Sequence, residues 1–146
     1  MGLAFVLMCA AVGSAKAVDA CSLLTDAQVS AAIGQAQAGK HMVPSSDAIC
    51  VWNGEGGKRV TLTLYTQVGT RSPMDRFNTA KTDVPGVTKT PVSGVGDEAF
   101  YSEARSLTVL VVRKGNTPFN VEMRGFPVEQ LKEKEKELAV ELVRKL

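Results

Sequence analysis

Hydrophobic and polar residues alternate most regularly between residues 59 and 66. The apolar positions are Val60, Leu62 and Leu64, and the positions that alternate with them are Thr61, Thr63 and Tyr65. This period of two residues predicts a strand with one buried face. Residues 48–53 form the strand before it, and the glycine-rich stretch 54–57 is the turn of the resulting hairpin.

A capping box marks the clearest helix start in the chain. Thr25 caps the helix while Gln28, three residues later, reaches back to the backbone of Thr25. The helix ends at Ile33, because Gly34 provides the left-handed residue that commonly stops a helix. We expect residues 35–47 to form a loop.

Two further helices are predicted from proline and spacing. Ser72 and Pro73 open a second helix with a cap and a first-turn proline, and Phe77 lies on its buried face. Pro127 starts the final helix, which runs to Leu146. Between these helices, a connection rich in proline and glycine covers residues 84–96.

Three more strands follow that connection, at residues 98–102, 106–114 and 118–124, and Gly115 and Asn116 form the turn between the last two. This turn sets the register of the hairpin. One face pairs Val112 with Phe119, Leu110 with Val121 and Thr108 with Met123; the other pairs Val111 with Asn120, Val109 with Glu122 and Leu107 with Arg124. The first face is apolar on both strands and should meet the helices.

The predicted order is αββαβββα. We therefore expect an α+β domain with a mainly antiparallel sheet of about five strands and three helices. Its length is that of a single domain with a modest hydrophobic core.

The N-terminal segment predicts export. Residues 3–13 are a short apolar run, and Ala15-Lys16-Ala17 is a small-x-small pattern for signal peptidase. We expect residues 1–17 to be a signal peptide and residues 18–146 to be the single mature domain, located in the periplasm or secreted. No lysine or arginine precedes the run, which is explained most simply by a true start upstream of Met1.

Two alternatives for this segment stay open. The apolar run could be a buried helix of a cytosolic protein, although it lacks a polar face. The chain could also be a lipoprotein, but neither Cys9, which follows Met8, nor Cys21, which follows Ala20, lies in a good lipidation motif. A lipid anchor is the minor alternative.

Export also predicts a disulfide. Cleavage after Ala17 removes Cys9 and leaves Cys21 and Cys50 in an oxidising compartment, where they should pair. The pair lacks the close spacing of redox-active cysteines, which favours a structural bridge.

Charge and composition exclude several partners. The net charge of +2 falls to +1 when Lys16 is removed, and no basic block stands out, which argues against nucleic acid. An aromatic content of 5% is low for a surface that stacks bases or sugars. No long apolar segment follows residue 17, so the mature chain should have no transmembrane segment.

The polar residues give no convincing catalytic, cofactor or metal site. The stretch Gly94–Ala99 has the letters of a dinucleotide-binding motif, but a strand follows it where the motif needs a helix, so its glycines are interpreted as a tight turn. Asp97 and Glu98 are adjacent and should point to opposite faces of a strand. His41 is expected in a polar loop with no aspartate or serine placed to make it a base, and one histidine with two bridged cysteines excludes an ordinary zinc site.

One acidic residue of the final helix falls among apolar positions. Glu135 lies inside the helical stripe and close to Leu142. The stripe consists of Val128, Leu131, Leu138, Leu142 and Leu146. The favoured interpretation is that Glu135 overhangs the sheet or pairs with an arginine; a functional carboxylate is the alternative.

Two stretches carry a resemblance to a known class of proteins. One runs from Cys21 to Val29 and on to Gly34; the other covers Val92–Phe100 and the strand that ends in Val112–Asn116. Together they resemble small exported bacterial proteins, many of them lipoproteins, that are classed as domains of unknown function. The resemblance implies a cell-envelope location, the Cys21–Cys50 pairing and an α+β fold, and it carries no catalytic residues.

The leading hypothesis is therefore a non-enzymatic binding or interaction module of the bacterial cell envelope, for an unknown protein or small envelope ligand. The alternatives are an enzyme with an unrecognised polar site and an inhibitor or immunity protein that acts on one partner. The candidate interaction surface is the mixed face of the sheet, which a partner or a second copy would contact unless a helix or the loop at 84–96 covers it. Its residues are Thr61, Thr63, Tyr65, Leu107, Val109, Val111, Asn120, Glu122 and Arg124.

Overall fold

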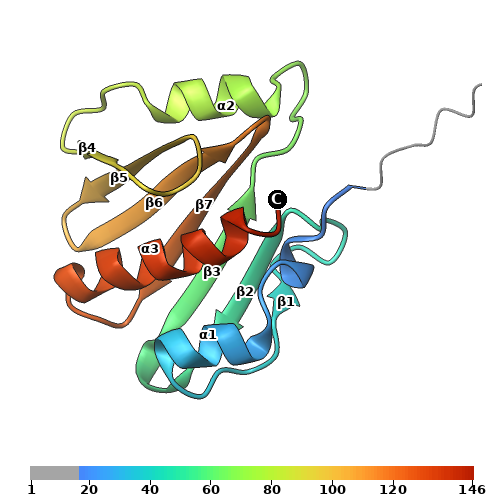
Figure 1. Cartoon of the computed structure of the whole chain (residues 1–146), viewed down its shortest axis with the longest axis vertical. Coiled ribbons are helices and arrows are strands. Elements are labelled where there is room, and N and C mark those ends of the chain that lie inside the picture. Colours follow the sequence, from blue (N-terminus) through green and yellow to red (C-terminus); the bar gives the residue numbers. More distant parts are fainter. Residues whose placement is uncertain (1–16) are drawn as a thin grey trace, which may run out of the picture.

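The computed structural model describes residues 17–146 (Figure 1). The predicted signal peptide lies outside this range except for its last residue. The α-helices are α1 (Asp26–Ile33), α2 (Pro73–Ala80) and α3 (Val128–Val143), with short 3₁₀ turns η1 (Ala20–Ser22) and η2 (Glu55–Gly57). The strands are β1 (Lys40–His41), β2 (Ile49–Asn53), β3 (Arg59–Leu64), β4 (Thr88–Val92), β5 (Glu98–Ala104), β6 (Leu107–Lys114) and β7 (Thr117–Arg124).

The strands form one antiparallel sheet in the order β1-β2-β3-β7-β6-β5-β4. The α+β class and the three helices are confirmed, but the sheet has seven strands where about five were predicted. The two missed strands, β1 and β4, are the edges of the sheet. β1 has only two residues, and β4 is largely exposed and contains Pro91. Edge strands tolerate proline and bury few side chains, so they lack the alternation that reveals a central strand.

Local capping signals place the first two helices. Thr25 and Gln28 form the predicted capping box of α1, and Gly34, with φ of +81°, follows its last residue. Ser72 caps α2, where Asp75 completes a second capping box. These bonds satisfy backbone N–H groups that the first turn of a helix leaves without a partner.

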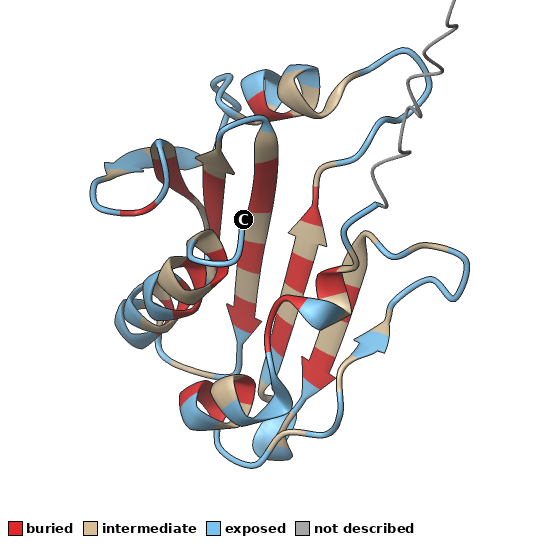
Figure 2. Ribbon diagram, turned by 45° about the vertical axis from the view of Figure 1, so that its right-hand side comes forward, coloured by how far each residue is buried: buried red, intermediate tan, exposed pale blue. Residues whose placement is uncertain are grey.

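The sheet has two unequal faces. Its inner face packs against α1 and α3 and forms the main core, which includes Trp52, Leu62 and Phe119. Its outer face packs against α2 in a smaller cluster built on Phe77 and Phe100. Figure 2 shows the resulting bands of buried and half-buried residues along the central strands. The predicted alternation in β3 is confirmed, with its apolar positions buried and its threonines half-buried.

The β6–β7 hairpin has the predicted register near its turn and departs from it further away. Val112 pairs with Phe119 and Leu110 with Val121, but the ladder ends at Val109–Glu122. The expected pairs Thr108–Met123 and Leu107–Arg124 do not belong to the ladder. The backbone N–H of Met123 instead donates to a side chain of α3, described below.

The stretch Gly94–Ala99 is a tight turn into β5, as its structural interpretation predicted. Gly94 and Gly96 both have positive φ, +80° and +59°. Beyond the turn, the Asp97 N–H donates to the carbonyl of Arg113, and the Asp97 carboxylate accepts from the Gly115 N–H. The turn therefore ties the start of β5 to the β6–β7 hairpin.

We expect Gly96→Ala to destabilise the fold by about 3 kcal/mol, against about 1 kcal/mol for Gly94→Ala. A Cβ atom at Gly96 would lie 2.5 Å from the carbonyl oxygen of Arg113 and 2.9 Å from Val112 Cγ1, whereas one at Gly94 meets open space. Both substitutions place a side chain at a residue with positive φ, so the difference between the two losses of stability measures the effect of the close contacts at Gly96. Urea unfolding measures both variants, and equal losses would contradict this account.

Candidate functional site

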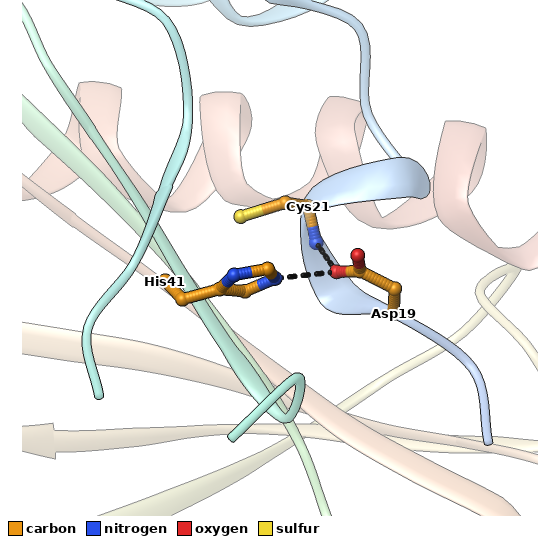
Figure 3. Close-up of side chains that lie close together, drawn as sticks. All are labelled: Asp19, Cys21 and His41. Atoms are coloured by element: carbon orange, nitrogen blue, oxygen red, sulfur yellow. Dashed lines mark hydrogen bonds and ion pairs between the residues drawn. The ribbon is translucent and has the colours of Figure 1, made fainter. Parts of the chain in front are cut away.

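Three side chains, one of which belongs to a disulfide-bonded cysteine, lie close together at the β1 edge of the sheet (Figure 3). Asp19, Cys21 and His41 each offer one donor atom, and these three atoms lie within 4.8 Å of one another. Asp19 caps the N-terminus of η1, Cys21 is the middle residue of η1, and His41 comes from β1. The Asp19 carboxylate accepts a hydrogen bond from the Cys21 N–H, which fixes the first turn of η1.

The predicted disulfide between Cys21 and Cys50 is confirmed. Cys50 is fully buried in β2, and Cys21 lies partly exposed in η1. A backbone hydrogen bond of 2.8 Å from the Ala20 N–H to the carbonyl of Asp47 holds η1 against the segment before β2. The bridge therefore closes on two segments that the backbone already brings together.

His41 is not in a loop without an acid, as the sequence suggested. It lies in β1, directly opposite Cys50, and its Nε2 atom is 2.8 Å from Asp19 Oδ1. A second carboxylate, Asp47 Oδ1, is 3.8 Å from the same nitrogen. Sequence reasoning missed this pair because 22 residues separate its members. They meet only because β1 pairs with β2 and η1 packs against the segment before β2.

The carboxylates make the His41 imidazole more basic. Its hydrogen bond to Asp19 raises the pKa of His41 above 6.5, partial desolvation opposes this, and the negative charges of Asp19 and Asp47 add to the rise. With the disulfide closed, the Cys21 sulfur is not a thiolate. The oxidised cluster then offers a metal one nitrogen and carboxylate oxygen, fewer protein ligands than a structural zinc site uses.

The carboxyl group of Glu135 is fully buried, which corrects the favoured interpretation that it overhangs the sheet or pairs with an arginine. Glu135 Oε1 accepts a hydrogen bond of 3.1 Å from the Met123 N–H, and the Thr108 hydroxyl lies 3.5 Å from Oε2. Thr108 and Met123 form the first predicted pair that the β6–β7 ladder lacks. The Glu135 carboxyl group therefore contacts both strands just beyond the end of their ladder.

Burial dominates the acidity of this group. Desolvation raises the pKa of Glu135 to about 8; the hydrogen bonds from Met123 and Thr108 oppose the rise, and the charges of Glu122 and Glu103 add to it. A pocket of about 510 Å³ lies between the β5–β6 turn, the end of β7 and the start of α3, and Met123 lines it. The Glu135 carboxyl group accepts hydrogen bonds from a backbone N–H and a hydroxyl of the same chain, which are the interactions of a structural residue.

The nine residues of the candidate interaction surface lie on the strands of the outer face or immediately after β3. Thr61 pairs with Glu122 and Thr63 with Asn120 across β3 and β7, and Val109 continues this row onto β6. β2 extends the face with Ile49 and Val51, which are half-buried and which sequence reasoning did not include.

Helix α2 covers one end of this face. Val111 is only 3% exposed because it packs in one cluster with Phe77 of α2 and with Phe100, its partner on β5, so it is unavailable to a binding partner. Tyr65 and Val109 border the same cluster and remain half-buried. The predicted residues other than Val111 and Tyr65 are half-buried or exposed, and we call these seven the outer patch: Thr61, Thr63, Leu107, Val109, Asn120, Glu122 and Arg124.

No family model, curated protein or solved structure matches this chain. Across residues 17–146, no helix has both the length and the apolar character needed to cross a membrane.

Proposed function

We propose that this chain is an exported, disulfide-stabilised binding module of the bacterial cell envelope, and that the outer patch is its contact surface for a protein partner. The main support for this proposal is that helix α2 covers only part of the outer face of the sheet. Helix α2 shields the end of the face at Val111 and leaves the outer patch accessible.

The chemistry of the outer patch suits a protein partner. Val109 and Leu107 offer apolar contact area, and the threonines of β3 offer hydroxyl groups beside them. Glu122 and Arg124 form an ion pair of 2.6 Å at one end of the patch. Interfaces combine apolar contact with polar groups at their rim in this way.

The proposed location of the module is based on the apolar N-terminal run and on the resemblance to exported proteins. The closed disulfide supports it, because such bridges persist in oxidising compartments and are rare in the cytosol.

Site-specific photocrosslinking in intact bacterial cells tests the surface and the location together. A photoreactive phenylalanine analogue at Thr61, in the middle of the outer patch, should give an adduct of discrete mass in the envelope fraction. The same residue at Lys136, which is exposed on α3, is the matched control and should give none. Val109→Lys should abolish the adduct at Thr61 by placing a charge in the contact area.

An adduct with twice the mass of the chain would identify a second copy as the partner and still place contact on the outer patch. Equal adducts from both positions, or none from Thr61, would contradict the assigned surface. Recovery of the chain in the cytoplasm would contradict the proposed export.

A further inference from the structure

The disulfide region contains residues of types that bind metal ions, but two of them, Cys21 and Cys50, are bonded to each other. Cys21 and Cys50 have their Cα atoms 5.0 Å apart, and His41 lies opposite Cys50 on the paired strand. Asp19 joins them through its contact of 2.8 Å with His41. One sulfur, one imidazole nitrogen and one carboxylate oxygen, from Cys21, His41 and Asp19, thus lie within 4.8 Å of one another, and the bridge attaches the second sulfur, that of Cys50, to this cluster.

We propose that reduction of the Cys21–Cys50 disulfide converts this cluster into a Zn²⁺ site, with Cys21, Cys50, His41 and Asp19 as ligands. Zinc binds four ligands of these types in a tetrahedron. Zn–S distances of about 2.3 Å and Zn–N or Zn–O distances of about 2.0 Å hold neighbouring donors roughly 3.2–3.8 Å apart. The donor atoms of Asp19, Cys21 and His41 already lie within 4.8 Å of one another, so adjustments on the order of 1 Å bring these three onto one metal ion. Cys50 becomes the fourth ligand once reduction lets its sulfur move away from that of Cys21.

The scaffold of the site does not depend on the bridge alone. The hydrogen bond from Ala20 to Asp47 positions η1, and the pairing of β1 with β2 positions His41 against Cys50. Leu23 and Leu24, which follow η1, are buried in the main core. These contacts keep the four ligands near one another after the sulfur–sulfur bond breaks.

The reaction balances with a phosphine as reductant. The phosphine gives two electrons to the disulfide and becomes a phosphine oxide, with its oxygen and the two thiol protons supplied by one water molecule. Zn²⁺ then binds both sulfurs as thiolates and releases the two thiol protons to solvent. Because both ligating sulfurs are consumed by the bridge, the oxidised chain lacks half of the ligand set.

The test compares reduced and oxidised mature chain after the phosphine has been removed without air. Reduced protein should bind one Zn²⁺ per chain, and Co²⁺ in its place should give the intense visible absorption of a tetrahedral thiolate site. Oxidised protein should show neither. If the reduced chain loses structure, Zn²⁺ should restore its circular dichroism, since metal binding then contributes to folding.

Two matched variants, Asp19→Asn and Asp47→Asn, distinguish loss of a metal ligand from loss of a nearby negative charge. Asp19→Asn and His41→Ala should each weaken Zn²⁺ binding by more than about 100-fold, as loss of a direct ligand exceeds the loss of a supporting group. Asp47→Asn removes an exposed carboxylate only 3.8 Å from the same imidazole, and screening by salt should limit its effect to about threefold. Equal Zn²⁺ binding by oxidised and reduced chain, or equal effects of the two Asn variants, would overturn the assignment.

Discussion

Replacing Cys21 and Cys50 together with alanine should lower the free energy of unfolding by about 3.5 kcal/mol. The bridge joins residues 29 positions apart, and without it the unfolded chain regains the conformational entropy of that loop. Alanine is preferred to serine because Cys50 is fully buried and a hydroxyl group there would need a hydrogen-bond partner. The loss is a large part of the 5–15 kcal/mol that a typical domain possesses. Chemical unfolding monitored by circular dichroism measures it.

A reductant distinguishes loss of the bridge from other effects of the substitutions. Reduction should bring the parent chain close to the stability of the double alanine variant and leave that variant unchanged. Titration of the denatured, unreduced mature chain should find no free thiol. Two titratable thiols in exported material, or equal stability of parent and variant under oxidising conditions, would show that the bridge does not support the fold.

Glu135→Gln should stabilise the protein at alkaline pH and leave its stability unchanged in acid. The folded-state pKa of Glu135, about 8, lies above the ordinary value of 4.5. Below pH 4.5 both states hold the proton. As pH rises from 4.5 to 8 the unfolded chain gives up its proton first, so the parent chain loses stability, on the order of 5 kcal/mol in all. Glutamine cannot ionise, and its side-chain carbonyl can still accept from the Met123 N–H.

Glu133→Gln is the matched control for this prediction, since Glu133 is exposed two residues earlier on the same helix. That variant should follow the pH dependence of the parent chain. Urea unfolding at about pH 4 and about pH 9 gives the two differences, and the parent and Glu135→Gln should diverge only at the higher pH. Parallel pH profiles for the parent and Glu135→Gln would mean that Glu135 is not buried as described.

Local sequence signals determined most of the secondary structure. The capping box at Thr25 and the stop at Gly34 depend on atoms a few residues apart, so the bounds of α1 follow from the sequence. Strict alternation determined which side chains of β3 are buried. The Gly115–Asn116 turn likewise determined the register of β6 and β7 for the pairs nearest to it.

Tertiary structure decided the features that depend on distant segments. β1 and β4 exist because a neighbouring strand offers hydrogen bonds, and their own sequences carry little periodicity. The end of the β6–β7 ladder depends on Glu135 of α3, whose carboxyl group takes the Met123 N–H from β6. A helical stripe shows that Glu135 faces the sheet, but only the packed structure shows that it meets the Met123 N–H and the Thr108 hydroxyl there.

The candidate sites divide in the same way. The predicted cleavage and export were enough to predict the disulfide, because in an oxidising compartment each of the two remaining cysteines would have only the other as a partner. The meeting of Asp19 with His41, and the cover of Val111 by α2, come from contacts between segments far apart in the chain. Sequence patterns report which residues share a face of one element; the arrangement of elements decides which faces meet, because that depends on packing across the whole core.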